Sequence, residues 1–374
     1  RIMKRNICLP AEWEPQSLVM LTWPHQATDW KPFLQDITET YVQMVSAITR
    51  YEPVVIATPH PIQVGALLGG RLPKEQMTKV YICHCKTNDT WARDHGPITL
   101  KERSSGNGGT DTNRSRSALT MLDFRFNGWG EKFQADLDNL VTRQLHADGA
   151  FDTAENGTPR LSDNDDFVLE GGAIESDGKG TVFTTSFCLL APNRNQPLDQ
   201  DEIEEELRFR LKAKRIVWLH HGSLKGDDTD GHIDTTVRLA PDDTILYNKC
   251  YDSNDEQYGD FLALEEELRA LRTTDGKPYR LIPLPQPAAI YDNGGTLSDR
   301  KEDGSYERLP ATYANFLIIN GAVIVPTYNQ PDNDKAACKA IAEAFPGRDI
   351  VPIDSRTIIR QHGSIHCCTM QVPL

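Results

Sequence analysis

Four short polar segments of the sequence are difficult to explain as packing. They are residues 88–97 (NDTWARDHGP), 170–172 (EGG), 226–234 (GDDTDGHID) and 362–369 (HGSIHCCT). Taken singly, each has a structural explanation, such as an ion pair of Arg93 and Asp94 or a buried, inert pair of Cys367 and Cys368. Taken together, they supply a nucleophilic thiol, an imidazole base and several carboxylates. That is a complete set for covalent catalysis on a cationic carbon.

The third segment has a spacing that favours cooperation between two of its side chains. In an extended chain the side-chain period is two, so His232 and Asp234 would share one face. The same rule applied to the fourth segment predicts that His366 and Cys368 face away from Cys367, and both are interpreted as structural. His362 is a weaker alternative to His232 as the base, because no Asp stands two residues after it.

Other chemistries find little support. There is no phosphate-binding G-x-x-x-x-G-K-[ST] segment, and Gly65 with the pair at 69–70 does not reproduce the dinucleotide spacing G-x-G-x-x-G. The run Cys83-His84-Cys85 is a local metal candidate, but no second ligand pair stands at zinc-site spacing. We therefore interpret it as two buried strand cysteines and expect neither a metal nor an organic cofactor.

Composition limits the classes of partner. The 374 residues carry 40 Lys and Arg against 54 Asp and Glu, a net charge of −14, which argues against nucleic acid and anionic membrane surfaces and suits a cationic ligand. The longest apolar stretch, 316–325, is too short to span a bilayer, and residues 1–8 lack a signal-peptide core. Eight thinly spread cysteines favour a reducing cytoplasm. A homo-oligomer is compatible with the sequence, which does not fix the number of copies.

The segments between these sites predict an α/β fold. Apolar and β-branched runs alternate with helical patterns in five units of strand, polar loop, helix and strand. The predicted elements are 17–23, 32–50 and 53–57; 118–126 and 131–145; 181–187, 199–211 and 215–219; 243–248, 259–271 and 280–283; and 322–326, 332–345 and 349–353. Such repeats must pack against one another, although a doubly wound sheet is the alternative. We expect long polar loops at 101–117, 147–166 and 298–307, and one domain over residues 1–374.

The four segments resemble those of the agmatine deiminases, in the guanidine-modifying (pentein) superfamily that also holds bacterial peptidyl-arginine deiminases. The matching runs are Trp91-Ala92-Arg93-Asp94-x-Gly96-Pro97, Glu170-Gly171-Gly172, Gly231-His232-Ile233-Asp234 and Ile365-His366-Cys367, in the family's order. The resemblance extends over essentially the whole chain. It implies a five-bladed α/β propeller with pseudo-fivefold symmetry, in agreement with the five units counted above.

The resemblance also implies roles for individual residues. Asp94 and Asp234 match the carboxylates that clamp a guanidinium, and Cys367 matches the nucleophile. His232 matches the general acid and base, and Glu170 matches the acid that hydrogen-bonds this imidazole. Trp91 is expected to form a wall against the substrate, and Asp228 is the candidate partner of a distal amine, with turn formation as its alternative role.

Several functions remain open at this point. The leading hypothesis is hydrolysis of agmatine to N-carbamoylputrescine and ammonia. Its alternatives are the same chemistry on peptidyl-arginine or free arginine, and transfer of the amidino group to an amine. A different class, a non-catalytic binding protein, is the remaining alternative, because one propeller of this kind is a ribosome-binding factor and a fold alone does not prove catalysis.

Overall fold

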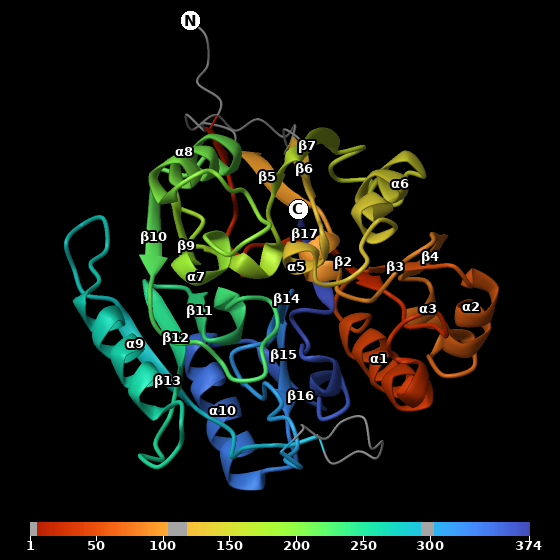
Figure 1. The fold of residues 1–374 in the computed structure, drawn as a ribbon. Coiled ribbons are helices and arrows are strands. Elements are labelled where there is room, and N and C mark those ends of the chain that lie inside the picture. Colours follow the sequence, from red (N-terminus) through yellow and green to blue (C-terminus); the bar gives the residue numbers. More distant parts are fainter. Residues whose placement is uncertain (1–5, 104–117, 293–302) are drawn as a thin grey trace, which may run out of the picture.

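The computed structural model describes residues 6–103, 118–292 and 303–374, and within them the chain forms five separate sheets. In sheet order these are β1 (Asn6–Cys8), β5 (Ile98–Arg103), β6 (Leu119–Arg125) and β7 (Arg160–Val168); β10 (Arg215–Leu219), β9 (Thr181–Thr185) and β8 (Ile174–Ser176); β11 (Val237–Ala240), β12 (Thr244–Lys249) and β13 (Arg280–Pro285); β14 (Leu317–Ile319), β15 (Ala322–Thr327) and β16 (Asp349–Asp354); and β17 (Thr369–Pro373), β2 (Gln16–Thr22), β3 (Val54–Thr58) and β4 (Val80–His84). Figure 1 shows these sheets distributed around the middle of the molecule.

Helices connect the strands and cover the outside of the sheets. The α-helices are α1 (Leu34–Ile48), α2 (Pro61–Gly69), α3 (Lys74–Met77), α4 (Ala92–His95), α5 (Gly128–Glu131), α6 (Val141–Ala147), α7 (Ser186–Leu189), α8 (Gln200–Leu211), α9 (Tyr258–Ala270) and α10 (Pro331–Ala344). Short 3₁₀ helices include Gly171–Ala173, Ile233–Thr235 and Ile358–Gln361. In Figure 1 the long helices α1, α8, α9 and α10 lie on the periphery. The mixed α/β class predicted from the sequence is confirmed.

One arrangement of strands recurs in all five sheets. A central strand pairs in parallel with the strand that follows its helix, and antiparallel with a second neighbour; the antiparallel pairs are β5·β6, β8·β9, β11·β12, β14·β15 and β17·β2. Strand β17, at the end of the chain, pairs with β2 near its beginning. Each of the four polar site segments leads into one of these antiparallel neighbours (β5, β8, β11 and β17), so four of the five sheets hold such a segment in an equivalent position.

The structure confirms most of the predicted elements to within a few residues. Strand β10 has the predicted bounds, and α8 begins directly after its N-cap Asp199, which forms a reciprocal capping box with Glu202. The antiparallel neighbours were not predicted, because strands of three to six residues are too short to show a clear period, and β14 lies in one apolar stretch with β15. The predicted loop 147–166 is wrong in its second half, where β7 pairs with β6 in spite of its polar sequence.

The predicted helix 131–145 is also wrong in part. The chain instead forms α5, a 3₁₀ turn at Asp138–Leu140, and the shorter α6. Trp129 and Gly130 have positive φ angles inside α5, and the Asn127 side chain accepts a hydrogen bond from the Gly130 amide. The amides of Leu137 and Asp138 bond to a side-chain oxygen of Asn88, so they do not continue a helix. This irregular loop turns Trp129 toward the site.

The central strands are buried on both faces. Val19 and Leu21 of β2 pack in one apolar cluster with α1, whereas Leu18 and Met20 pack in a second cluster on the opposite face. This burial fixes the strand register, because a one-residue slip would exchange the two faces. No helix in the described part of the chain has the length and apolar character that a membrane crossing requires. Of the predicted loops, 104–117 and 298–302 lie outside the described residues.

Candidate active site

Five residues stand at equivalent places, two to four positions before the antiparallel neighbour of each sheet. They are Asp94 before β5, Glu170 before β8, Asp234 before β11, Asn315 before β14 and Cys367 before β17. All five are buried, with Cys367 the most exposed at 5%. Residues distant in the sequence are brought together because the five loops meet. The sequence predicted four of these positions and missed Asn315.

Gly172 marks the point at which the functional groups converge. A Cβ atom on this glycine would lie 2.6 Å from His232 Nδ1, 2.9 Å from Asp94 Oδ1 and 3.1 Å from Asp234 Oδ2. Such distances leave no room for a side chain. The glycine therefore lets one imidazole and two carboxylates face the same small volume, which explains why the acid Glu170 is followed by glycines.

The expected extended conformation of His232-Ile233-Asp234 is wrong. His232 is followed by a 3₁₀ turn over Ile233–Thr235, closed by a 2.8 Å hydrogen bond from the Thr235 hydroxyl to the His232 carbonyl. The turn arises because Thr235 offers a local donor that competes with strand pairing. His232 and Asp234 still face Gly172 together, by way of this turn instead of a strand.

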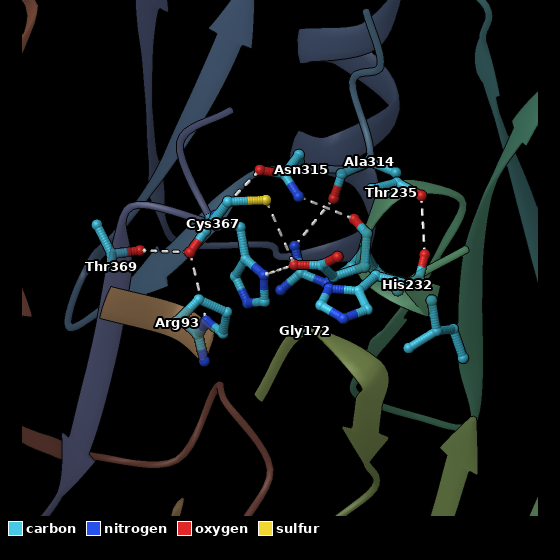
Figure 2. A network of polar contacts seen from close by, with 12 residues as sticks. Arg93, Gly172, His232, Thr235, Ala314, Asn315, Cys367 and Thr369 are labelled. Atoms are coloured by element: carbon cyan, nitrogen blue, oxygen red, sulfur yellow. Dashed lines mark hydrogen bonds and ion pairs between the residues drawn. The ribbon is translucent and has the colours of Figure 1, made fainter. Parts of the chain in front are cut away.

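Cys367 also lies in a turn, not in an extended strand. Residues 365–368 form the turn, and β17 begins at Thr369. Figure 2 shows Cys367 beside Asn315, whose side-chain oxygen accepts a 3.2 Å hydrogen bond from the Cys367 amide. Arg93 donates its backbone amide to the Cys367 carbonyl at 3.2 Å. The thiol lies 3.9 Å from Asp234 Oδ2. The backbone of Cys367 is thus held at both its amide and its carbonyl group.

The neighbouring Cys368 is directed elsewhere. It is fully buried in the apolar cluster that contains Tyr41, and burial raises its pKa to about 12. The sequence interpretation of Cys368 as structural agrees with this placement. His366 was interpreted in the same way, and its Nδ1 lies 2.7 Å from Asp234 Oδ2.

The two clamp candidates, Asp94 and Asp234, differ in their environments. Asp94 accepts hydrogen bonds from Trp129 Nε1 at 2.9 Å and from the Gly172 amide at 3.1 Å. Burial raises the pKa of Asp94 to about 6, with the carboxylates of Asp234 and Glu170 adding to the shift and His232 opposing it. At neutral pH this carboxyl is largely ionised, but it lies close to protonation.

Asp234 has the opposite shift. Although burial opposes it, the hydrogen bond and charge of His366 lower the pKa of Asp234 below its ordinary value, and His232 acts in the same direction. His366 occupies Oδ2, while Oδ1 is buried without a hydrogen-bond partner among the described residues. An unpartnered buried carboxylate oxygen is costly unless a ligand supplies a donor.

His232 lies between carboxylates. Its Nε2 is 3.4 Å from Glu170 Oε1, and its Nδ1 is 3.7 Å from Asp94 Oδ1. Although burial opposes it, the charge of Asp94 raises the pKa of His232 well above its ordinary value, and Cys188 and Glu170 add to the effect. The imidazole is therefore a cation at neutral pH, able to donate a proton.

Glu170 is kept ionised by an arginine that the sequence analysis missed. Arg194 Nε and Nη2 lie 3.0 and 2.7 Å from Glu170 Oε1, and Nη1 lies 2.8 Å from Asp230. Against the effect of burial, Arg194 and His232 lower the pKa of Glu170 to about 2. Arg194 stands in the polar run 192–197, which carries no local signal that it returns to the site.

The thiol of Cys367 is not ionised by its surroundings. Burial raises its pKa well above the ordinary value, and the negative charges of Asp234 and Asp94 add to the shift. A thiol beside two carboxylates stays protonated until a cation neutralises them. In the free site the Cys367 thiol is therefore held protonated.

A cavity opens onto these groups and is lined largely by acids and aromatic rings. It encloses about 610 Å³, including space open to solvent, and is lined by Asp29, Asp89, Trp91, Asp94, Trp129, Phe133, Asp228, Thr229, Gln361, His362, Gly363 and Cys367. Burial raises the pKa of Asp228 to about 6, with Asp227 adding to the shift and His362 opposing it. The lining suits an elongated cation with an apolar middle.

The predicted wall residue Trp91 lies in this cavity, fixed by packing. Its ring contacts Trp30 and Trp129, with centroids at 5.8 and 6.5 Å. A Cβ on Gly363 would lie 2.2 Å from a ring carbon of Trp91, so only glycine fits there. The glycine that precedes the nucleophile turn is thus required by the aromatic wall.

His362, the alternative candidate for the base, lies apart from the groups that converge on Gly172. It has a left-handed backbone, and its Nδ1 lies 2.7 Å from the Gly226 carbonyl at the edge of the cavity. Trp129 and His366 were also absent from the predicted site. The run Gly128-Trp129-Gly130 was the available sequence signal for Trp129, because glycines permit the positive φ angles that this loop has. The position of His366 beside Cys367 was the signal for that residue.

Two groups of potential metal ligands in the described chain already contact protein cations. Glu170, Cys188 and His232 adjoin Arg194, and Glu12, Glu175 and His366 adjoin Arg238. The guanidinium groups satisfy these carboxylates, so neither group offers a free set of ligands. The expectation of two buried strand cysteines at 83 and 85 is wrong in part. Cys83 lies in β4 but is half-buried, whereas Cys85 is buried directly after the strand, with its thiol 3.3 Å from Gln144 Oε1.

Comparisons with known proteins cover nearly the whole chain. An agmatine deiminase from Medicago truncatula is 31% identical over 380 residues, which is 98% of this chain and 96% of that protein. The crystal structure of a putative arginine deiminase from Porphyromonas gingivalis has 44% identity and a TM-score of 0.85, covering 98% of both chains. A cysteine-to-serine variant of the C. jejuni agmatine deiminase, solved with substrate bound, has 34% identity and a TM-score of 0.83, covering 100% of this chain and 98% of that one. Residues 8–373 match the Porphyromonas-type peptidyl-arginine deiminase family, and the chain belongs to that family.

Proposed function

We propose that this protein hydrolyses agmatine to N-carbamoylputrescine and ammonia. The observation that carries the proposal is the convergence of one thiol, one imidazole and two carboxylates on the space beside Gly172, within a cavity lined by further acids. Relatives that span this chain are agmatine deiminases, including one whose structure holds its substrate. These relatives also favour an enzyme over the non-catalytic binding protein.

Asp94 and Asp234 are the proposed clamp for the guanidinium. A guanidinium presents five N–H donors in one plane, and each carboxylate can accept two of them. Asp234 Oδ1 lacks a partner among the described residues, and both carboxylates are buried. The bound cation would supply the missing donors and neutralise both charges, so that its carbon is held beside the Cys367 sulfur.

The first half of the reaction forms a covalent intermediate. The bound cation neutralises Asp94 and Asp234, whose charges raise the pKa of Cys367, so substrate binding promotes ionisation of the thiol, whose proton passes to solvent water. The thiolate attacks the guanidinium carbon and forms a C–S bond in a tetrahedral adduct. One C–N bond then breaks, His232 gives its proton to the departing nitrogen, and ammonia leaves an amidino-thioether on Cys367.

The second half consumes water and restores the free thiol. His232, now neutral, accepts a proton from the attacking water, whose oxygen bonds to the amidino carbon. The C–S bond then breaks, the sulfur takes the hydroxyl proton of the adduct to become a thiol again, and the product leaves with a ureido group. Glu170 supports both halves because, with its pKa held at about 2 mainly by Arg194, it remains an anion beside His232. Each proton transfer therefore prepares His232 for the next.

Substrate selection depends on the far end of the cavity. Asp228 is the proposed partner of the primary ammonium of agmatine, because its half-buried side chain lines the cavity that contains Cys367. A half-buried acid left without its cationic partner disfavours ligands that lack the amine. Turn formation remains the alternative role of Asp228. Asp29 and Asp89 line the same cavity and are the next candidates for the amine contact.

The same chemistry on an arginine substrate is the second candidate function. It is favoured by the family description and by the putative arginine deiminase from Porphyromonas gingivalis. A colorimetric ureido assay on agmatine, free arginine and a capped arginine peptide tests both functions together. Turnover of agmatine at least about a hundredfold above the other two supports the proposal, and preference for the peptide or for arginine would replace it.

Architecture and location complete the proposal. We infer that residues 1–374 form one catalytic domain whose five sheets are the blades of a pseudo-fivefold propeller, supported by their shared strand arrangement. The eight cysteines are free, which favours a reducing compartment such as the cytoplasm. Association into a homo-oligomer stays a prediction.

The first prediction concerns the nucleophile. Cys367→Ser is expected to lower kcat for agmatine at least about a thousandfold, because a hydroxyl is a far weaker nucleophile than a thiolate. Cys368→Ser, the matched control on the adjacent residue, is expected to keep substantial activity. Steady-state ureido formation measures both variants. An inactive Cys368→Ser protein beside an active Cys367→Ser protein would show that the nucleophile is misassigned.

The second prediction concerns the space at Gly172. Gly172→Ala places a methyl group within 3.1 Å of three site residues, so we expect kcat/KM to fall at least about a hundredfold through displaced side chains. The control is Gly259→Ala in α9, where an added Cβ meets no atom within 4 Å. That variant is expected to retain wild-type activity. Wild-type kinetics in Gly172→Ala would mean that the reacting groups lie elsewhere.

The third prediction concerns the partner of the amine. Asp228→Asn is expected to raise KM for agmatine about tenfold, because the ammonium loses its charged partner. The same variant is expected to act on an alkylguanidine without an amine as the wild type does. Steady-state kinetics on both substrates measure this difference. Equal losses on the two substrates would assign Asp228 to the structure of its turn.

The fourth prediction concerns pH. Asp94 has a pKa raised to about 6 and carries its charge only above it, so kcat/KM should fall as pH decreases through about 6. Asp228 has a similar pKa, so agmatine kinetics should fall more steeply than those of an alkylguanidine. The profile of kcat/KM against pH for both substrates measures this, with circular dichroism as the folding control. A flat profile down to about pH 4.5 would exclude an Asp94 that titrates near 6.

A further inference from the structure

A buried histidine next to the nucleophile has no task in the mechanism above. His366 is fully buried, and its two ring nitrogens face two different carboxylates. Nδ1 lies 2.7 Å from Asp234 Oδ2, and Nε2 lies 2.8 Å from Glu12 Oε1. These three residues come from three distant parts of the chain, so the contact depends on the completed fold.

The geometry determines the charge that this ring must carry. Ionised carboxylates only accept hydrogen bonds, so an imidazole between two of them satisfies both only when both of its nitrogens carry hydrogen. A neutral ring would direct one lone pair at an oxygen. The arrangement therefore calls for an imidazolium.

The charged groups around His366 also favour a positively charged ring. Glu12 also contacts Arg238 at 2.5 Å and Arg93 at 3.3 Å, and Arg238 contacts Glu175 at 2.6 Å. With His366 charged, three cations (Arg93, Arg238, His366) face three anions (Glu12, Glu175, Asp234). With His366 neutral, the buried group would carry an excess negative charge, which is strongly unfavourable away from water.

The two ends of this network differ in their access to solvent. Asp234 is fully buried, whereas the Glu12 side chain keeps 18% of its surface exposed. Glu12 lines a second cavity, which shares no lining residue with the cavity around Cys367. Glu12 is therefore partly hydrated and can stay ionised, so it can fix His366 from the side remote from the substrate.

We propose that His366, fixed by Glu12, is the positioning residue that keeps Asp234 ionised and turns its Oδ1 toward the guanidinium. His366 occupies Oδ2, which leaves Oδ1 as the buried oxygen without a partner among the described residues. The clamp is thus oriented before the substrate arrives. This inference rests on the proposed function for its kinetic consequences, but the state of the ring is independent of any substrate.

Two variants of similar size separate the two contacts of His366. The amide of His366→Asn lies near the position of Nδ1 and can still donate to Asp234, whereas the amide of His366→Gln lies near Nε2 and reaches toward Glu12. We expect His366→Gln to lose at least about a hundredfold in kcat/KM for agmatine, mainly through KM, with an acid limb moved to higher pH. His366→Asn should remain within about tenfold of the wild type. Equal losses in both variants, in parallel with lost thermal stability and with an unmoved acid limb, would overturn the proposal.

A substrate-free measurement separates this inference from the proposed function. In ¹⁵N NMR spectra of histidine-labelled wild-type protein, recorded under the conditions of the activity assay, the ring signals that disappear in His366→Gln should show both nitrogens protonated. A neutral tautomer under those conditions would overturn the proposal whatever the kinetics. If the wild type turns over no guanidino compound while the ring is doubly protonated, the proposed function fails and the charge state of His366 stands.

Discussion

The repulsion between two buried carboxylates is the constraint on which the rest of this site depends. Asp94 and Asp234 both face Gly172, within about 3 Å of the position that a Cβ would occupy there. The two carboxyl groups respond to this repulsion with pKa shifts of opposite direction. His366 lowers the pKa of Asp234, whereas the pKa of Asp94 rises to about 6. The unbalanced charge also keeps the Cys367 thiol protonated. A bound guanidinium would relieve all three effects together, so in the proposed mechanism selectivity for a cation and activation of Cys367 have the same origin.

The fold satisfies this constraint by bringing one loop from each of five sheets to the same place. Each loop precedes a short antiparallel strand, and β17 joins the end of the chain to β2 near its start. Backbone contacts then fix the reacting groups: Asn315 holds the amide of Cys367, and the Gly172 amide binds Asp94. Arg194 and Arg238 supply positive charge behind the site. Buried cations placed in this way allow several acids to remain ionised in a small volume.

The sequence predicted the parts of this arrangement that have local patterns. Long helices and apolar central strands such as β10 appeared within a few residues of their predicted bounds. The short strands beside the site were missed, because three to six residues next to a polar loop give too little periodicity. The predicted site residues Cys367, His232, Asp94, Asp234 and Glu170 stand in recognisable motifs. Asn315, Trp129, Arg194 and His366 act through contacts that form only when distant segments meet. The prediction of an extended chain at His232 and Asp234 was also wrong, because the Thr235 hydroxyl closes a turn there.

The central claim, that the guanidinium neutralises the buried pair of carboxylates, can be measured directly as a proton balance. Titration calorimetry of Cys367→Ser with an alkylguanidine, in buffers of different ionisation enthalpy, gives the number of protons exchanged on binding without contributions from the thiol or from an amine. Because Asp94 titrates near 6 in the free protein, binding should release more than about half a proton at about pH 5.5 and close to none at about pH 8. Binding without proton release at the lower pH, or with proton uptake, would contradict this account.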